Sequence, residues 1–495
     1  MKYSSYIFVA LLLALYFILD FHNILFFRPQ GIHFIRQSDS LSFVANYYKN
    51  GFHFFEPQVF NLQSTDGKAA CEFPILYYIT ALLYLIFNEH EFILRLLTLS
   101  IASAGFLYLF KLILLLLKDV VYAFAFTFLF ISSTVLLYYS NNFLPDPSAL
   151  GFTLIGWYCF FNFFKNGKNK KSLLLCFIFF SLAALLKVTY FINPVAAILS
   201  VFTYEFFRKK GFKKGVIKNI FPLILFASSL TLIFLWNAYV LYYNQINHDN
   251  YFLVHALPLW DLSKNESAVV WDHILNFWYS KYYYQSTFHV FAMIIIAGIF
   301  FIRKSEKLIL IPALFLAAGS TCYFVLFFAA FKYHDYYFIT LMPSIIFIII
   351  STFVAIKNKF PKWSNHYAAK SLVILLCVLS LNYAKEKLVQ RYINNEDLHS
   401  SIGTKLADSR KFIDSLVPEN AKVIIVTDQT PNGALYFINR SGWNIRDTSE
   451  KSKADIATYI SQGAQYILYT DKKYIDDSFE GKKIGEEKGI VLYKL

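Results

Sequence analysis

The stretch IRQSDSLSFVANYY, residues 35–48, places an acidic side chain shortly after the first strongly apolar segment of the chain. That acid is Asp39. A carboxylate at a membrane edge costs little if it faces water, but costs much more if it packs near lipid, so an acid in this position is a candidate functional residue. The alternative is structural, because Ser38, Asp39 or Ser40 could cap a short helix that starts here.

Composition places the whole chain in the membrane class. Of its 495 residues, 57% are hydrophobic and 16% are charged, and the mean hydropathy is +0.46. Water-soluble domains carry about a quarter charged residues. The formal net charge is +14, but the Lys and Arg residues gather in short loops between apolar runs, a distribution that indicates membrane topology rather than nucleic-acid binding. We therefore expect a polytopic α-helical membrane protein with a polar tail.

The direction of the helices follows from one short segment. Residues 73–87 form an apolar run that is shorter than the roughly 20 residues of a full crossing. If this run only dips into the membrane, every strongly basic loop falls on the inner side. The first span is then a retained helix, Asp39 lies outside, and about eleven spans are expected in all. They cover residues 7–21, 92–117, 120–140, 148–164, 173–189, 191–207, 220–241, 288–302, 308–331, 337–355 and 369–384.

Two outer segments carry further expectations. Leu41, Val44, Tyr48 and Phe52 recur at helical spacing, which predicts a short amphipathic helix lying on the membrane. A long outer loop rich in Tyr, Trp and His is expected at residues 242–287.

The composition changes near residue 385. Buried strands are predicted at 421–427, 464–470 and 489–495, with helices at 432–438 and 453–461 between them. Because strands and helices alternate, residues 385–495 are expected to form a small α/β domain with a partly parallel sheet. Residues 1–384 form the predicted membrane domain, and an odd number of spans places the α/β domain on the extracytoplasmic side.

Three more polar clusters fall on the outer side in this topology. Glu72 precedes a Phe-Pro pair, Asp146 lies in LPDPS, and His334 with Asp335 lies in YHDYYF. Each has a structural alternative. Glu72 could stabilise a helix N-terminus by its charge. Asp146 could cap a helix with Pro147 at the first position, and the His334 segment could belong to an interfacial belt.

Cations accompany these acids. Arg36 lies three residues before Asp39, and Arg95 and Lys187 lie near the outer ends of predicted spans. A Lys inside an apolar run either extends its amine to the interface or pairs with an anion. A lipid-linked phosphate is one suitable anion for Lys187.

In the order and spacing of these short motifs, the membrane part resembles the GT-C glycosyltransferases, in the group of protein mannosyltransferases and bacterial aminoarabinose transferases. The resemblance implies a polyprenyl-phosphate sugar donor, inversion at the anomeric carbon and a carboxylate base at Asp39. The matching features are Asp39, Glu72 to Pro74, Asp146-Pro147, Lys187, and His334 to Tyr337.

The chain departs from that family pattern in two places. The mannosyltransferases carry an Asp-Glu pair where this chain has Asp39-Ser40, so their substrate does not carry over. The aminoarabinose transferases carry a Glu-Lys-Pro-like sequence where this chain has Glu72-Phe73-Pro74. The phosphate contact of the missing Lys would then fall to Lys187, Arg36 or Arg95.

The expected function is a cell-membrane glycosyltransferase that moves a sugar from a polyprenyl phosphate to a hydroxyl of a lipid, polysaccharide or protein acceptor. Catalytic roles fall to Asp39, Asp146 and Glu72. Substrate-binding roles fall to Arg36, Lys187, Arg95, His334, Asp335 and Tyr336. Aromatic residues of segment 242–287 fit sugar stacking: Trp271, Trp278 and Tyr282 to Tyr284.

A transporter or flippase of lipid-linked sugars is the alternative. Few carboxylates lie inside the apolar runs and no internal repeat is evident, which counts against it. The five cysteines lack metal-ligand spacing. No cofactor is assigned, and divalent metal dependence stays open.

Overall fold

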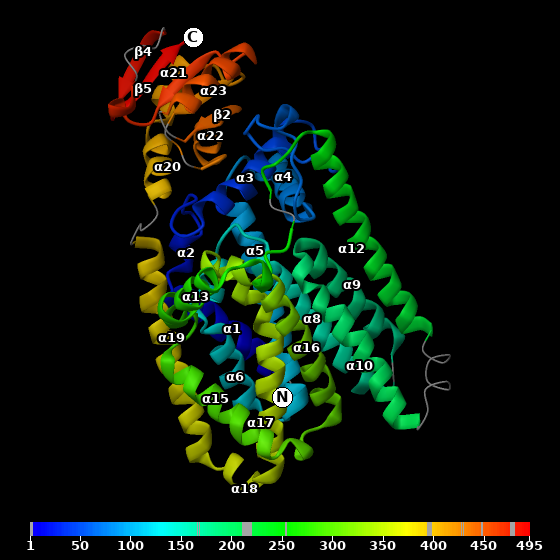
Figure 1. Cartoon of the computed structure of the whole chain (residues 1–495). Helices are drawn as coiled ribbons and strands as arrows, with labels where there is room; N and C mark the ends of the chain where they lie inside the picture. Colours follow the sequence, from blue (N-terminus) through cyan, green and yellow to red (C-terminus); the bar gives the residue numbers. More distant parts are fainter. Residues whose placement is uncertain are drawn as a thin grey trace. The chain divides into compact units, whose positions relative to one another are not determined.

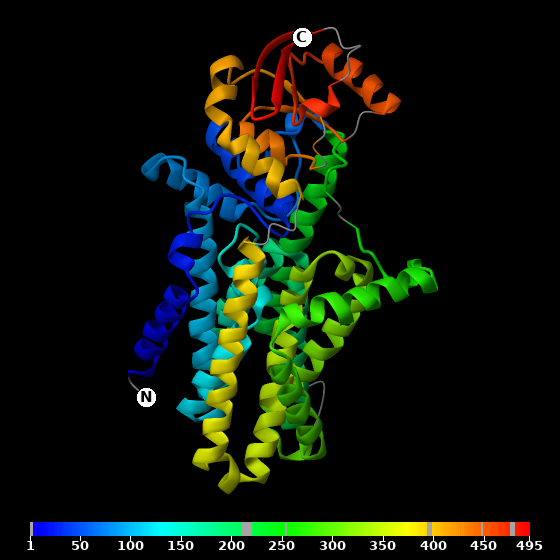
Figure 2. The same ribbon diagram turned by 90° about the vertical axis from the view of Figure 1, so that its left-hand side faces the viewer.

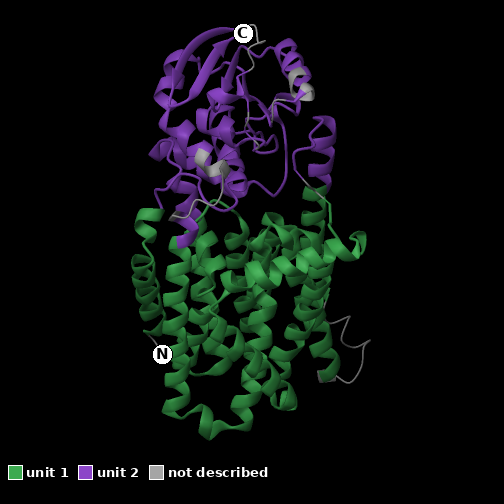
Figure 3. Cartoon of the chain, turned by 60° about the vertical axis from the view of Figure 1, so that its left-hand side comes forward, with its two compact units in different colours: residues 1–24, 98–237, 255–389 green, residues 25–97, 238–254, 390–495 purple. Residues whose placement is uncertain are grey.

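The structure is a computed structural model (Figure 1). It describes residues 3–165, 167, 169–209, 220–252, 255–393, 398–426, 428, 430–446, 449–475 and 481–495. Two compact units can be distinguished (Figure 3). Unit 1 comprises Met1–Ile24, Thr98–Asn237 and His255–Val389. Unit 2 comprises Leu25–Leu97, Ala238–Val254 and Gln390–Leu495, so segments far apart in the sequence fold together with the C-terminal region.

Unit 1 is helical. Its apolar helices match the predicted spans in position, and α5, α12 and α19 each run from one unit into the other. The helices are α1 (Ser4–Ile18), α5 (Phe92–Leu117), α6 (Val120–Ile131), α7 (Thr134–Ser140), α8 (Asp146–Lys165), α9 (Lys170–Leu186), α10 (Ile192–Lys209), α12 (Ile220–Ile246), α15 (Gln285–Phe300), α16 (Lys307–Leu326), α17 (Met342–Lys359) and α19 (Tyr367–Ile393).

The expected class of polytopic helical membrane protein is confirmed, but the count of eleven spans is not. Among the described residues, six helices are long and apolar enough to cross a membrane, or up to eight if each of two bent pairs is one span. One bent pair is α6 with α7, which meet at 78°. Several other helices at predicted span positions, such as α9 with 17 residues, are shorter than a full crossing.

The prediction of a long loop over residues 242–287 is wrong. Helix α12 continues to Ile246, and a second helical segment begins at Lys264 with α13 (Lys264–Asp272). Ser263 and Glu266 form a reciprocal capping box that starts this segment. A π-helical turn (His273–Trp278) and α14 (Tyr279–Tyr282) follow directly. The sequence signal was present in the Ser-x-x-Glu spacing.

Most of the aromatic residues expected to stack on sugars pack inside unit 1 instead. Trp278, Tyr282 and Tyr283 are buried, and the ring of Tyr282 stacks on Phe338 at 4.2 Å between centroids. Trp271 keeps 44% of its surface exposed. The tyrosine run thus contributes to the core of unit 1.

The C-terminal part of unit 2 is an α/β domain, drawn in orange and red in Figure 2. Its five-stranded sheet has the order β2-β1-β3-β5-β4. The strands are β1 (Val423–Val426), β2 (Gly442–Ile445), β3 (Tyr466–Tyr469), β4 (Lys482–Glu487) and β5 (Ile490–Lys494). Pairing is parallel between β2, β1 and β3 and antiparallel between β3, β5 and β4, which confirms the partly parallel sheet. The helices are α20 (Leu398–Asp408), α21 (Arg410–Leu416), α22 (Gly433–Ile438) and α23 (Glu450–Ser461).

Two strands escaped the sequence reading. Strand β2 has only four residues, and β4 is a polar edge strand of sequence KKIGEE. Neither strand shows the apolar run or the alternation that indicates a strand. The charged residues of β4 suit an edge strand, because they hinder pairing with other chains.

Candidate functional site

Asp39 lies in α3 (Phe34–Lys49), a helix of unit 2. The helix begins at Phe34, and the preceding His33 has a left-handed backbone and no side-chain capping bond. Asp39 is therefore in the second turn, and the capping alternative for it is excluded. Twelve of the sixteen residues of α3 are buried, among them Leu41 and Val44. The prediction of an amphipathic helix on the membrane surface is wrong, because protein covers α3 on most sides.

The first residue of α3 anchors this helix to the C-terminal domain. Phe34 is fully buried, and its ring stacks on Phe437 with 5.5 Å between centroids. Glycines on α20 and α22 make room for it. A Cβ atom would lie 2.6 Å from the Phe34 ring at Gly403 and 2.7 Å from it at Gly433, so any larger residue would force the ring to move.

The Asp39 carboxylate is 1% exposed and is held by groups from three segments of unit 2. The Tyr251 hydroxyl donates to Oδ1. The Asn432 Nδ2 atom donates to the same oxygen at 3.4 Å. The Nη1 atom of Arg36 lies 3.7 Å from Oδ2. The two oxygens therefore have different surroundings, with hydrogen bonds at Oδ1 and an ionic neighbour at Oδ2.

Glu72 holds Arg36 in place. The Arg36 Nη2 atom donates to Glu72 Oε1 at 2.7 Å, and the Tyr77 hydroxyl donates to the same carboxylate oxygen. The following helix, α4 (Ile75–Phe87), has Pro74 at its N-cap and no side-chain capping bond. Glu72 thus acts as the counterion of Arg36, and the helix-cap alternative does not hold. With 13 residues, α4 is about 20 Å long, short of the roughly 30 Å hydrocarbon core.

The two carboxylates have opposite pKa shifts. Burial raises the pKa of Asp39 to about 6, and the opposing effects of Arg36 and the two hydrogen-bond donors only partly offset it. Burial also acts to raise the pKa of Glu72, but Arg36 and hydrogen bonds outweigh it and bring the pKa down to about 2. At neutral pH Glu72 is a fixed anion, while Asp39 is ionised but has a proton affinity suited to general base catalysis.

Arg95 lies elsewhere in unit 2. It is fully buried, and its Nη2 atom donates to the Phe27 carbonyl oxygen at 2.9 Å. The structure thus shows its guanidinium in a hydrogen bond to the protein backbone.

The second polar cluster belongs to unit 1. Asp146 is the first residue of α8, and Lys187 lies at the break between α9 and a 3-10 turn (Val188–Phe191). Their side chains form an ion pair of 3.0 Å, with Asp146 2% exposed. The Lys187 amine also lies 4.8 Å from the ring centres of Tyr336 and Tyr337, within the range of cation–π attraction. Lys187 therefore pairs with an anion inside the protein.

The HDYY segment packs around this ion pair. Asp335 is fully buried and accepts a 2.6 Å hydrogen bond from the Tyr139 hydroxyl. The ring of His334 lies 5.4 Å from that of Tyr336. An interfacial belt would leave Asp335 exposed, so the burial of this carboxylate favours a role within unit 1.

The predicted site residues thus form two groups, each described within its own unit. Arg36, Asp39 and Glu72 meet in unit 2. Asp146, Lys187 and His334 to Tyr336 meet in unit 1. Sequence reasoning missed Tyr251, Asn432, Tyr77 and Tyr139, because an isolated Tyr or Asn has no local signal that separates a site contact from a turn or a core position. Among the described residues, no group of three or more His, Cys, Asp or Glu side chains could hold a metal ion.

No protein-family model matches this chain, and no curated protein matches it by sequence. Solved structures do. ArnT from Cupriavidus metallidurans in the apo state superposes with a TM-score of 0.61 and 10% identity, over 99% of this chain and 97% of that one. The same protein bound to undecaprenyl phosphate gives a TM-score of 0.59 and 12% identity over the same shares. This chain therefore has the fold of ArnT.

A second solved protein shares this fold over a smaller part of its length. The oligosaccharyltransferase of Archaeoglobus fulgidus in its apo form superposes with a TM-score of 0.51 and 13% identity, over 89% of this chain and 66% of that one. The resemblance drawn from five short motifs is thus confirmed for the fold alone. A shared fold at such low identity does not fix the chemistry, which depends on the side chains of this chain.

Proposed function

We propose that this protein is a membrane glycosyltransferase that moves a sugar from a polyprenyl phosphate to an acceptor hydroxyl, with Asp39 as general base. One observation carries the proposal. In this chain, Asp39, the acid after the first apolar segment, is a buried carboxylate with a pKa of about 6, flanked by Arg36 and by hydroxyl and amide donors.

The step balances without a cofactor. Asp39 takes the proton of the acceptor hydroxyl, and the freed oxygen forms a bond to the anomeric carbon. The bond between that carbon and the phosphate oxygen breaks, its electron pair stays on the phosphate, and the configuration inverts. Phosphate is a good leaving group once a cation offsets its charge, so positioning and electrostatics supply most of the catalysis.

Tyr251 and Phe252 bear on how the acceptor reaches the base. The Tyr251 hydroxyl bonds Asp39 directly, and the Phe252 ring lies 5.6 Å from the Arg36 guanidinium. Because Asp39 is 1% exposed, substrate binding must displace part of this cover. The bond from Tyr251 shows that the carboxylate already accepts from a hydroxyl group.

The remaining predicted residues keep proposed supporting roles. In unit 2, Arg36 is the cation beside the base, and Glu72 orients it. In unit 1, we assign Lys187 an anion-binding role, with Asp146 as the group that holds the amine in place before a phosphate arrives. Roles in substrate binding for Arg95, His334, Asp335 and Tyr336 stay proposals of the same kind.

The place and partners of the reaction belong to the proposal too. The chain is a multi-pass membrane protein by its apolar helices. We place its C-terminal domain on the extracytoplasmic side of the cell membrane, because the basic loops then lie inside. The acceptor is a lipid, polysaccharide or protein hydroxyl of the cell envelope.

The test is transfer of radioactive sugar from a panel of polyprenyl-phosphate sugars by the purified protein. Asp39→Asn is expected to abolish transfer while the protein remains folded. Asp20→Asn is the matched control, because Asp20 is 57% exposed and its left-handed backbone suits Asn. Undiminished turnover by Asp39→Asn would refute the role of this base. Sugar that changes membrane side in vesicles without being transferred would favour a flippase.

A further inference from the structure

Asn432 stands at the N-cap of α22, in the turn that follows β1 of the C-terminal domain, and it is fully buried. Both ends of its side-chain amide are engaged. The Oδ1 atom accepts from the Phe60 backbone amide at 3.0 Å and lies 3.5 Å from the Ser42 hydroxyl. The Nδ2 atom donates to Asp39 Oδ1. Because the oxygen is fixed by Phe60, the amide nitrogen must point at the carboxylate.

The turn that carries Asn432 is itself braced. Asp428 accepts from the backbone amide and the hydroxyl of Thr430 at 2.9 and 2.6 Å, and from the Ala434 amide at 3.1 Å. The Asn61 side chain donates to the Pro431 carbonyl oxygen. A residue held by so many local bonds loses little further entropy when it orders a neighbour.

We propose that Asn432 is a positioning residue for the base, so that the C-terminal domain takes part in catalysis by orienting Asp39. The proposal rests on the proposed function. Asn432 and Tyr251 both bind Oδ1, whereas Oδ2 is 3.7 Å from the nearest Arg36 nitrogen, beyond hydrogen-bond range. This arrangement assigns Oδ2 as the oxygen that accepts the proton.

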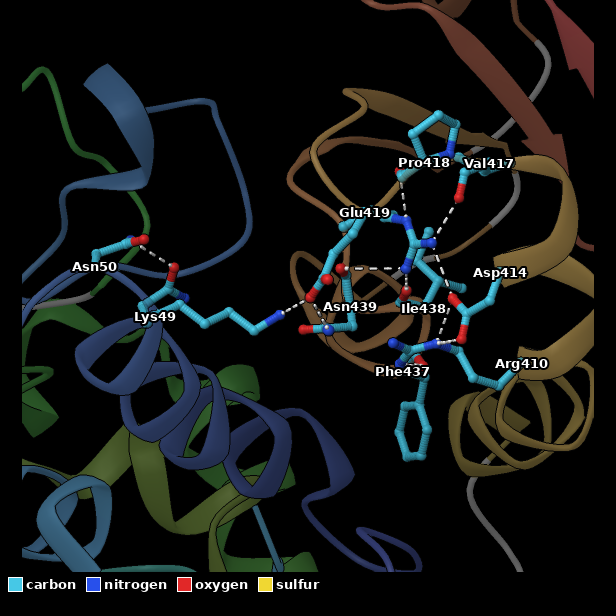
Figure 4. Close-up of polar contacts among 12 residues, drawn as sticks. Lys49, Asn50, Arg410, Asp414, Val417, Pro418, Glu419, Phe437, Ile438 and Asn439 are labelled. Atoms are coloured by element: carbon cyan, nitrogen blue, oxygen red, sulfur yellow. Dashed lines mark hydrogen bonds and ion pairs between the residues drawn. The ribbon is translucent and has the colours of Figure 1, made fainter. Parts of the chain in front are cut away.

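Helix α3 contacts the domain at both of its ends, and the buried Phe34 ring is the main anchor. Phe34 fills the slot between the two glycines at the first residue of the helix. At the last residue, Lys49 forms a 2.6 Å ion pair with Glu419, which also accepts from Asn439 (Figure 4). Between these anchors, Asn432 meets the middle of the helix. These contacts give the domain a structural reason to be needed for catalysis.

Asn432→Asp separates the two functions of this side chain. The new carboxylate still accepts from Phe60, but it loses the donor to Asp39 and places a negative charge beside it. Other charged or titratable groups around Asp39 are unchanged: Arg36 on α3, Glu72 and Tyr77 around the start of α4, Tyr251, and Asp428 in the same turn. The acid limb of the rate–pH profile should move up by about one unit or more. The kcat should fall about tenfold, with the donor KM changed less than about twofold.

Two control variants leave the Asn432–Asp39 bond in place. Ser42→Ala removes the other acceptor of the Phe60 amide, at 3.2 Å, and the 3.5 Å contact to Asn432 Oδ1, but it leaves the Asn432 Nδ2 donor to Asp39 intact. Glu419→Gln removes the charge of the exposed docking pair with Lys49. Both should keep the wild-type pH profile. If Asn432→Asp does not fold, Asn432→Ser is used, because its side chain is too short to reach Asp39.

Each outcome decides a different question. A raised acid limb in the Asn432 variant, with wild-type limbs in both controls, supports the positioning role. A wild-type profile and kcat in a folded Asn432 variant overturn it, even if Asp39→Asn is inactive. An active Asp39→Asn variant instead overturns the proposed function itself.

Discussion

Replacing Arg36 by Met tests the electrostatics of the site most directly. Met preserves much of the volume of Arg and removes the charge that lies 3.7 Å from Asp39 Oδ2. Because Arg36 acts to lower the pKa of Asp39, the substitution should raise that pKa above its present value of about 6. The base would then be protonated over more of the neutral range, and transfer at pH 7 should fall.

The size of the effect follows from the geometry. An opposite charge within about 4–6 Å of a carboxylate shifts its pKa by roughly 1–3 units. Starting from about 6, the ionised fraction at pH 7 falls from roughly nine-tenths to between about one-half and one-hundredth. A loss of about 2-fold to 100-fold in kcat/KM is therefore expected at pH 7, with much of the activity recovered near pH 9.

The assay is kcat/KM for sugar transfer between pH 5 and 9, with the folded fraction measured for each variant. Arg36→Met also leaves Glu72 without its counterion, which costs roughly 3–5 kcal/mol when a buried pair is broken. The double variant Arg36→Met/Glu72→Gln removes both charges and should be more stable than Arg36→Met. Its acid limb should lie at lower pH than that of Arg36→Met, because Glu72 acts to raise the pKa of Asp39. An unmoved acid limb in folded Arg36→Met would refute the assignment.

Three further predictions concern stability and coupling. Asp39→Asn should raise Tm at pH 7. Folding raises the pKa of Asp39 by about two units, so the ionised carboxylate destabilises the folded wild type by up to about 3 kcal/mol above pH 6. The Tm advantage of the Asn variant must therefore vanish near pH 3, where Asp39 is protonated in both the folded and unfolded states. Gly403→Ala should cost roughly 1–3 kcal/mol, because the two atoms nearest to the added Cβ both belong to the Phe34 ring. Phe34→Leu in the same chain should return part of this loss, and equal losses from Gly403→Ala with and without Phe34→Leu would contradict the clash. Lys187→Met should lose roughly 3–5 kcal/mol by leaving Asp146 buried without its cation, whereas Lys187→Met/Asp146→Asn should lose less; additive losses in a double-mutant cycle would rule out the pairing.

Local patterns were enough for several conclusions. Long apolar runs predicted the helices of unit 1, since hydropathy is a property of consecutive residues. Three of the five strands were predicted because β1, β3 and β5 are continuous apolar stretches. Asp39 was singled out for its place after the first such run, and the order of short motifs was enough to indicate the GT-C fold.

The sequence alone was thus enough to assign the class of protein, the positions of most helices and the acid of interest. The surroundings of that acid follow only from tertiary packing. Asn432 is 393 positions from Asp39 along the chain and Tyr251 is 212 positions away, so no local pattern links them. Packing of α3 against the C-terminal domain brings these donors to the carboxylate, and burial raises its pKa. Both effects arise only when distant segments meet and exclude water.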